Sequence, residues 1–373
     1  MRNERMLAEF IELVQTDSAS RKETLVANKL IQKLSDLGFE IRRDNVGQTF
    51  GGECDNVLGI LKGELPGTLL LCSHMDRVPN GYGIKPVEKD GILYSDGTTI
   101  LAADDIAGVC VILEAVRRVL DAGAKLPTLE VLFTVGEELS LCGSAGMDPN
   151  FIQAKEGYIF DSSGSFGRFV SHTPGRCSLS VEITGLAAHA GNEPEKGIDA
   201  AKCLAEILAK LPTGRLDPET TSNFPVIETG TKATNVVCDY AKLVGEARSF
   251  NDARLLSYQE EFKTLCEETA AKYGAGCKVG ITVDYHPMNV EKDSHVVQVA
   301  QRAGDKLGAN PHFDRAGGGM DANNFNYIGI ATIGVACGYS KNHTLQEQMV
   351  LEDFFKAGDL AEQLILTWAE DCK

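Results

Sequence analysis

The sequence predicts an α/β fold, in which a largely parallel β-sheet is covered by helices on both faces and a small ferredoxin-like α+β domain is inserted into the larger one. In the first and last parts of the chain, short and almost entirely apolar strands alternate with helical patterns, which indicates strands buried on both faces. Between these parts the expected order is strand–helix–strand–strand–helix–strand, the ferredoxin-like arrangement. A length of 373 residues is sufficient for two domains.

The first part of the chain begins with two amphipathic helices. One is expected from about Arg5 to Gln15. The second begins at Ser20-Arg-Lys-Glu23, which matches a capping box, and ends at Gly38, which suits the position after a helix. The elements that follow are strands over 39–43, 56–61 and 68–73, a helix from near Asp105, and strands over 129–135 and 157–160.

The pattern changes near Thr173 and returns to the α/β type after His286-Pro287. Within the insertion we expect strands over 177–184, 224–229, 235–248 and 278–285, and helices over 198–211 and 252–273. A helix over 296–307 and an apolar strand over 330–336 follow it. The expected domains are therefore a large one formed by residues 1–173 and 286–373, and an inserted one formed by residues 174–285.

Composition narrows the classes of partner and the compartment. A formal net charge of −17 disfavours binding to nucleic acid or to an anionic membrane surface. No window approaches 18 consecutive apolar residues, so no membrane span is expected. The 11 cysteines are scattered singly without a CxxC pair, and no secretory signal precedes them, which favours free thiols in the reducing cytoplasm.

Acidic and histidine side chains follow the ends of the apolar strands of the large domain. Those residues are His74 and Asp76 after 69–73, Glu137 and Glu138 after 131–135, Asp161 after 158–160, and His343 after 333–336 and a glycine-rich loop. The pair Asp104-Asp105 precedes the long helix. Because ligands bind at the carboxyl ends of strands in open α/β sheets, we expect these groups to converge. Histidine nitrogens and carboxylate oxygens are typical ligands of borderline divalent metals, zinc above all.

Each of these residues also has a simpler interpretation when taken alone. Asp104-Asp105 fits a helix cap, the His74–Asp76 pair a surface turn, Glu137-Glu138 a solvated turn, Asp161 a strand end, and His343 an ordinary loop. Their shared position at strand ends favours the metal site, in which Asp76 would orient the His74 ring. Cys72 and Cys142 are rival thiolate ligands that we assign to packing.

In these motifs the chain resembles the co-catalytic zinc peptidases that include peptidase T, carboxypeptidase G2-like enzymes and acylases, and it is most similar to the peptidase T-like members. The motifs are Ser73-His-Met-Asp76, Ser95-Asp-Gly-Thr-Thr-Ile-Leu-Ala-Ala-Asp-Asp105, Gly136-Glu-Glu138, Ile159-Phe-Asp161, Gly317-Gly-Gly-Met-Asp321 and His343-Thr344. The resemblance runs over essentially the whole chain, in order, and includes the inserted domain.

The resemblance implies a site with two Zn²⁺ ions, for which Co²⁺ or Mn²⁺ are alternatives. Asp104 would bridge both metals, with His74 and Asp161 completing one site and Glu138 and His343 the other. Glu137 would be the general base that takes a proton from a metal-bridging water as this water attacks the amide carbonyl. Asp76 would hold His74, and the Asp104–Asp105 peptide would be cis.

The resemblance also gives the inserted domain a role as a lid and as the dimerisation domain of a homodimer. His189, in Gly185-Leu-Ala-Ala-His-Ala-Gly191, would reach the partner subunit's active site and stabilise the oxyanion. Arg248 would receive a substrate carboxylate, and Asn235 would contact the substrate. The simpler interpretations are a loop histidine for His189 and a surface charge at a strand end for Arg248.

The expected function is a zinc-dependent aminopeptidase or tripeptidase that releases the N-terminal residue of a short peptide. Asp161 in place of a glutamate favours the aminopeptidase and dipeptidase branches of the family. Ile106 and Arg77 stand where much of the family has lysine and threonine, which bears on substrate preference. Two alternatives remain open: hydrolysis of N-acyl amino acids at the same site, and a non-catalytic metal-binding dimer on the same fold.

Overall fold

The computed structural model describes residues 2–231 and 233–372. The chain divides into two compact units, one formed by the chain up to Thr173 and from Met288 onward, the other by Pro174–Pro287. Each unit has a hydrophobic core of its own. Among the described helices, none is long and apolar enough to cross a membrane.

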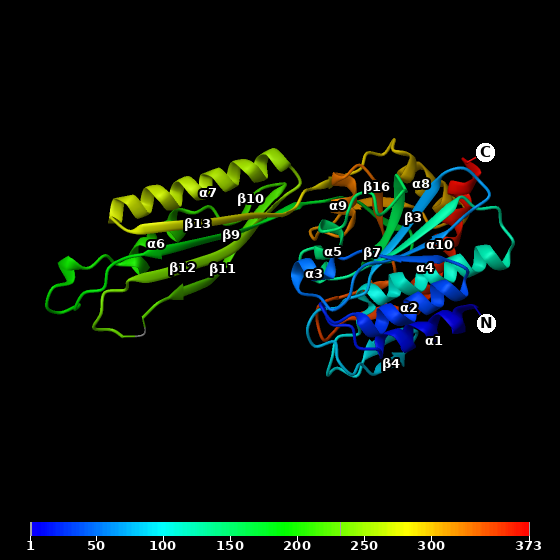
Figure 1. Cartoon of the computed structure of the whole chain (residues 1–373), viewed down its shortest axis with the longest axis horizontal. Coiled ribbons are helices and arrows are strands. Elements are labelled where there is room, and N and C mark those ends of the chain that lie inside the picture. The colour runs from blue at the N-terminus through cyan, green and yellow to red at the C-terminus, as the bar shows by residue number, and fades with distance from the viewer. Residues whose placement is uncertain (1, 232, 373) are drawn as a thin grey trace. The chain divides into compact units, whose positions relative to one another are not determined.

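The first unit is built around a nine-stranded sheet with the order β1-β2-β6-β3-β7-β16-β8-β14, in which β15 also pairs with β8. Strands β3, β7 and β16 of this sheet are labelled in Figure 1. The central strands β6, β3, β7 and β16 are parallel, as predicted, whereas β1 and β2 run antiparallel at the edge. The strands are β1 Glu40–Arg43, β2 Val57–Leu61, β3 Thr68–His74, β6 Thr128–Thr134, β7 Glu156–Ser162, β8 Arg168–Thr173, β14 Met288–Asn289, β15 His312–Arg315 and β16 Ala331–Ala336.

Helices cover both faces of this sheet, which confirms the predicted fold class. Ser73 Oγ reaches Asp105 at the start of α4, whereas Thr134 Oγ1 reaches Asp321 just before α9. Ser73 pairs with Phe133, the residue before Thr134, and successive side chains of a strand point to opposite faces, so α4 and α9 lie on opposite faces. The helices are α1 Arg2–Val14, α2 Thr24–Asp36, α3 Gly47–Phe50, α4 Ala103–Asp121, α5 Cys142–Ala145, α8 His295–Lys306, α9 Ala322–Tyr327 and α10 Leu351–Glu370.

Several elements of the first unit were not predicted, among them its last helix and a small second sheet. Helix α10 packs against α4 and α8, and its start has no side-chain cap that would mark it in the sequence. A small antiparallel sheet has the order β17-β18-β5-β4. Its strands are β4 Pro86–Lys89, β5 Ile92–Ser95, β17 Tyr339–Ser340 and β18 Gln348–Val350.

The predicted capping box at the start of α2 is wrong. Helix α2 begins at Thr24, and its N-cap residue Glu23 makes no side-chain capping bond. Ser20 Oγ instead donates to Asp76 Oδ2 at 2.6 Å, and Glu23 Oε1 accepts the main-chain N–H of Gly136 at 3.1 Å. Both side chains that the local pattern assigns to a capping box therefore bind residues that are distant in the sequence. The predicted C-terminal glycine, Gly38, does adopt a positive φ of 87°.

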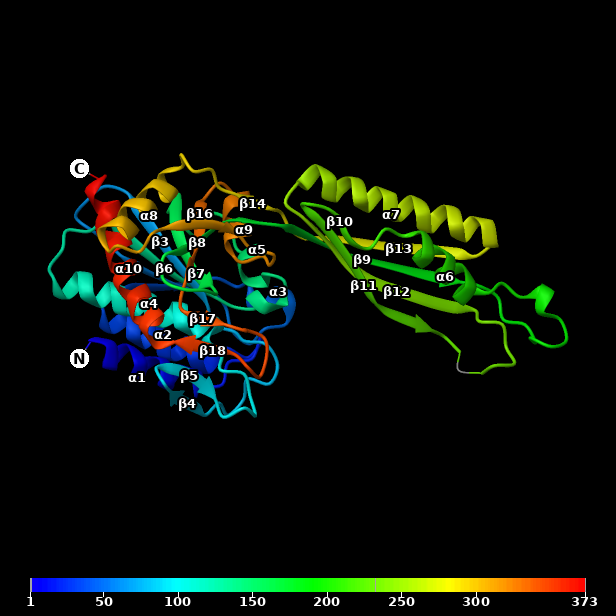
Figure 2. The same ribbon diagram turned by 180° about the vertical axis from the view of Figure 1, so that it is seen from behind.

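The second unit is a five-stranded antiparallel sheet with the order β10-β11-β12-β9-β13, and α6 and α7 pack against it (Figure 2). Its elements are β9 Gly175–Thr184, α6 Ala200–Lys210, β10 Gly214–Asp217, β11 Thr220–Thr229, β12 Tyr240–Ser249, α7 Asp252–Tyr273 and β13 Gly276–Tyr285. The predicted order is present, with β10 as an additional edge strand. Strand β12 begins later than residue 235, because the segment before it pairs with the loop around His189.

Candidate active site

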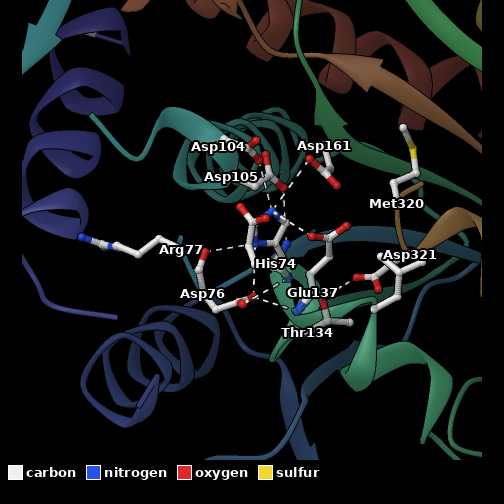
Figure 3. A network of polar contacts seen from close by, with 12 residues as sticks. His74, Asp76, Arg77, Asp104, Asp105, Thr134, Glu137, Asp161, Met320 and Asp321 are labelled. Carbon is white, nitrogen blue, oxygen red and sulfur yellow. Dashed lines mark hydrogen bonds and ion pairs between the residues drawn. The ribbon is translucent and has the colours of Figure 1, made fainter. Parts of the chain in front are cut away.

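Three neighbouring parallel strands bring polar side chains to one edge of the large sheet. Strand β3 ends at His74, which pairs with Thr134 at the end of β6, and Asp161 lies near the end of β7. In Figure 3 the side chains of His74, Asp104, Asp161 and Glu137 point toward a common centre. His74 and Asp104 are 1% and 7% exposed, so this centre lies inside the unit.

The five predicted ligands make up two of the three candidate ligand groups found among the described residues, and these two groups share one carboxylate. His74, Asp104 and Asp161 form one group, and Asp104, Glu138 and His343 form the other; the ligand atoms of each group lie within 4.8 Å of one another. His74 Nε2 is 3.2 Å from Asp104 Oδ1 and 3.8 Å from Asp161 Oδ1. His343 Nε2 is 3.1 Å from Asp104 Oδ2 and 3.0 Å from Glu138 Oε1.

The ring of His74 is oriented by Asp76. Its Nδ1 lies 3.1 Å from the main-chain oxygen of Asp76 and 3.4 Å from Oδ1 of the same residue. Because both partners are acceptors, Nδ1 carries the proton and donates it toward Asp76, which leaves Nε2 to face the carboxylates.

The same aspartate also holds the turn after β6. Asp76 Oδ1 accepts the N–H of Glu137 at 2.9 Å and Oδ2 accepts the N–H of Glu138 at 3.3 Å. Gly136 begins this turn with φ 60°, and a Cβ there would lie 2.9 Å from the Phe50 ring. Glu137, at the start of the 3₁₀ helix η1 (Glu137–Leu139), is 8% exposed with Oε2 3.9 Å from His74 Nε2.

Asp104 stands at an irregular start of α4. Ala102 has a left-handed φ of 56°, and the Asp104–Asp105 peptide is cis, as the resemblance implied. Regular helical geometry begins only after Asp105. Asp105 turns away from the two groups, because its Oδ2 accepts the hydroxyl of Ser73 at 2.5 Å and the N–H of His74 at 3.3 Å. The two aspartates therefore differ in their surroundings despite being neighbours.

The charges of the two histidines and Asp104 are mutually stabilised. Burial would lower the pKa of His74, but hydrogen bonding to Asp104 and Asp76 raises it well above its usual value. Bonds to Asp104 and Glu138 raise the pKa of His343 to about 10. Burial would raise the pKa of Asp104, but both histidines hold it well below its usual value.

The pKa values of two further carboxyls at this centre, Glu137 and Asp161, are raised and not lowered. Burial raises the pKa of Glu137 well above its usual value, and the neighbouring Asp161 carboxylate adds to this effect. Burial likewise raises the pKa of Asp161, with a further contribution from Asp105. Crowded buried carboxylates repel one another, so the arrangement favours cations at its centre.

Sequence reasoning missed four polar residues around this centre. Asn342 Nδ2 donates to Asp104 Oδ2 at 2.6 Å, and Tyr339 Oη donates to Asp161 Oδ1 at 3.1 Å. Glu23 and Glu347 are buried carboxylates that accept main-chain N–H groups near the predicted ligands. The sequence does show that Glu347 follows His343 by four residues. This spacing alone does not indicate that Glu347 binds the main chain of Asp104.

Residues that departed from the family pattern have structural roles. Arg77 is 1% exposed, and its guanidinium donates to the main-chain oxygens of Val14 and Thr16 at the end of α1, each at 2.9 Å. Ile106 is fully buried in α4. Both side chains are buried, and their bearing on substrate preference stays a prediction. Cys72 and Cys142 are absent from the candidate ligand groups found among the described residues.

The predicted substrate-binding residues all lie in the second unit. His189 forms a bridge with Val236, and the main-chain oxygen of Asn235 accepts the N–H of Ala190 at 3.0 Å, so the structure brings His189 and Asn235 together. Arg248 lies eight residues beyond the start of β12, roughly 27 Å along the strand. It pairs with Arg176 on β9, and its Nε donates to Glu246 Oε1 at 2.7 Å.

Comparisons with known proteins agree with this architecture. The model of peptidase family M20/M25/M40 matches residues 70–367. The chain is 38% identical to the uncharacterized protein YqjE of Bacillus subtilis strain 168, and the match covers 97% of each protein. The structure of aminopeptidase PepT from Bacillus cereus ATCC 10987 superposes with a TM-score of 0.91 at 39% identity, covering 98% of each chain. That of a tripeptidase from Staphylococcus aureus Mu50 gives 0.94 at 31% identity, covering 99% of each. The chain therefore belongs to peptidase family M20/M25/M40, and within it to the peptidase T-like proteins.

Proposed function

We propose that the protein is a metal-dependent exopeptidase that removes the N-terminal residue of short peptides, with tripeptides as the first substrates to test. The observation that carries the proposal is the pair of ligand groups sharing Asp104, with Glu137 beside them. The relatives described as an aminopeptidase and a tripeptidase, which match over nearly the whole chain, supply the substrate class.

The donor set fits two divalent cations, and zinc in particular. It consists of two imidazole nitrogens and three carboxylates, all of which are zinc ligands in proteins. Ligand atoms about 2.1 Å from a tetrahedral ion lie roughly 3.4 Å from one another, and the contacts within the two groups range from 3.0 to 3.8 Å. His74 and Asp161 would hold one ion, Glu138 and His343 the other, and Asp104 both. Such ions, when bound, would polarise the scissile carbonyl and lower the pKa of water.

Glu137 is proposed as the general base. Its buried carboxylate and ligand atoms of His74 and Glu138 lie within 4.8 Å of one another, a position that suits a residue that must accept a proton and then release it. Glu137 would take one proton from the attacking water and deliver it to the nitrogen of the leaving amine, which balances the cleavage of the amide bond. Asp76 would keep the Glu137 main chain and the His74 ring in place for this transfer.

His189 is proposed to stabilise the developing oxyanion. Its Nδ1 accepts the N–H groups of Gly191 and Asn192 at 3.1 and 3.2 Å. The neutral ring therefore carries its proton on Nε2, where it can donate to an oxyanion. Asn235, beside it, would contact the substrate, and Arg248 would bind the substrate carboxylate through its guanidinium.

A homodimer is part of this proposal, with the second unit as lid and dimerisation domain. Within that unit, His189 and Asn235 lie at the end of β12 that begins at Tyr240, whereas the chain enters and leaves the unit at the other end, where Gly175 pairs with Ser249. The end that carries His189 is thus the one remote from the covalent connections. This placement supports a role for His189 in the active site of a partner subunit.

The decisive test combines metal content with substrate choice. We expect the wild-type protein to bind two ions per chain and to cleave tripeptides from the N-terminus, and the Glu137→Gln variant to keep both ions while kcat falls at least ~10²-fold. Activity only on N-acetyl amino acids would replace the peptidase proposal with the amidohydrolase. Bound metal with no hydrolysis in the wild type would favour the non-catalytic dimer.

A further inference from the structure

Glu347 is a buried carboxylate that binds the turn leading to Asp104. The residue is only 1% exposed and lies in the loop between β17 and β18. Glu347 Oε2 accepts the N–H groups of Leu101 and Ala102 at 2.9 and 2.8 Å, and Oε1 accepts the N–H of Asp104 at 3.0 Å. Three converging main-chain N–H groups form a concave anion site, and here the anion is supplied by the chain itself.

This turn depends on an anion because of its backbone shape. Ala102 adopts a left-handed φ of 56°, and the N–H groups of 101, 102 and 104 all point to one side, toward Glu347. These donors lie before regular helical geometry begins, so the helix provides no acceptors for them. Glu347 therefore accepts the main-chain N–H groups of Leu101, Ala102 and Asp104.

The loop that carries Glu347 also carries His343. In this loop Lys341 and His343 have positive φ values of 56° and 63°, which gives the loop a defined shape. Asn342 Nδ2 and His343 Nε2 both contact Asp104 Oδ2, at 2.6 and 3.1 Å. One loop thus contacts the Asp104 carboxylate through two side chains and the Asp104 main chain through a third.

We propose that Glu347 is a positioning residue that locks the Asp104 turn to the His343 loop, so that both ligand groups are completed together. Asp104 belongs to both groups and His343 to one, so a displacement between turn and loop would disturb the two groups at once. This inference rests on the proposed metal site, but it concerns a residue that lies outside the ligand set. It predicts that metal affinity depends on a carboxylate that contacts no metal.

The test uses Glu347→Gln with Glu130→Gln as a matched control. Glu130 is also 1% exposed and also accepts main-chain N–H groups with both oxygens, those of Gln153 and Ala154 at 2.9 to 3.0 Å. It lies four residues before the end of β6 at Thr134, about 13 Å from the site edge along the strand. In Glu347→Gln, the new side-chain amide would present a donor where one of the turn's N–H groups needs an acceptor.

Zn²⁺ affinity is measured on the metal-free full-length protein by competition with a chromophoric chelator, and the Tm of the same sample by circular dichroism. We expect Glu347→Gln to weaken binding of both ions by ~10–100-fold, while Glu130→Gln lowers Tm and leaves Zn²⁺ affinity unchanged. Equal Zn²⁺ affinity in wild type and Glu347→Gln would overturn the inference. Equal weakening in both variants would also overturn it, because the effect would then be general destabilisation.

Two further arms keep the test decisive. If Glu347→Gln does not fold, Glu347→Asp is compared with Glu130→Asp in the same titration, because aspartate keeps the charge but not the reach to all three donors. Absence of Zn²⁺ binding in the wild type would refute the proposed function itself. Two bound ions in the wild type, with no change in the Glu347 variant, would refute only the positioning role.

Discussion

Asp76 Oδ1 accepts the main-chain N–H of Glu137 at 2.9 Å, although the two residues are 61 positions apart in the chain. The same carboxylate binds the next N–H of the turn and lies beside Nδ1 of His74. One aspartate therefore joins a predicted ligand on β3 to the predicted base after β6.

Loss of the Asp76 carboxylate should reduce catalysis more than it reduces folding stability. In Asp76→Asn only one side-chain oxygen remains as an acceptor, so the N–H of Glu137 or that of Glu138 loses its partner and the base is held less firmly. We expect kcat/KM on a tripeptide to fall by ~10–100-fold. Ser20→Ala, which removes one hydroxyl donor to Asp76 Oδ2, serves as the mild control, with a less than tenfold effect. A kcat/KM for Asp76→Asn no lower than that of Ser20→Ala would contradict this role.

Asp104 and Asp105 should respond very differently to substitution. Asp104 belongs to both ligand groups, whereas Asp105 binds Ser73 and the N–H of His74. Asp104→Ala should therefore lose both metal ions together, and Asp105→Asn should retain measurable metal with a smaller loss of activity. Metal per chain after dialysis, determined by elemental analysis, checks this. Retention of one tightly bound ion in Asp104→Ala would show that the two groups are independent.

Mixing two inactive variants should restore activity if His189 serves the partner subunit. His189→Ala and Glu137→Gln are each expected to be nearly inactive. In a mixed dimer, the subunit with His189→Ala keeps its own Glu137 and receives His189 from the partner. Random exchange at equal amounts puts one complete site in half of the dimers, which corresponds to roughly 25% of wild-type activity. No recovery after exchange, verified by tagged subunits, would place His189 in its own subunit's site or outside catalysis.

His295 should contribute to stability mainly at low pH. Its Nδ1 lies 2.7 Å from Glu156 Oε2 and its Nε2 2.9 Å from Asp371 Oδ2. Burial would lower the pKa of His295, but these two carboxylates raise it above the usual 6.5. The contribution is therefore full below pH 6.5 and is lost as pH rises through the folded-state pKa. Since the ring is 38% exposed, the effect should stay below about 1 kcal/mol.

Urea unfolding of wild type and His295→Gln at several pH values measures this contribution. The difference in free energy of unfolding should be largest near pH 6 and should shrink by pH 9. A difference that grows with pH would mean that the neutral ring, and not the charged one, is the stabilising form.

The fold class and the grouping of the candidate site residues could be predicted from the residues alone. Continuous apolar runs such as 69–72 can only be buried on both faces, and parallel strands deliver the residues after them to one edge. For this reason His74, Glu137, Glu138 and Asp161 could be grouped before any coordinates. Helix α7 also follows from its local pattern alone, since Asn251 caps it and Gly274 ends it.

The groups that hold these residues in place are visible only in the folded chain. Ser20 and Glu23 fit a capping box by spacing, yet they bind Asp76 and Gly136. Glu347 gives no local pattern, because its partners are main-chain N–H groups more than 240 positions away. Main-chain donors are identical at every residue, so no sequence pattern marks the ones that a distant carboxylate will bind. The chemical type of each site residue can be predicted from the sequence. The contacts that hold these residues in place depend on where the folded backbone presents N–H groups that need an acceptor.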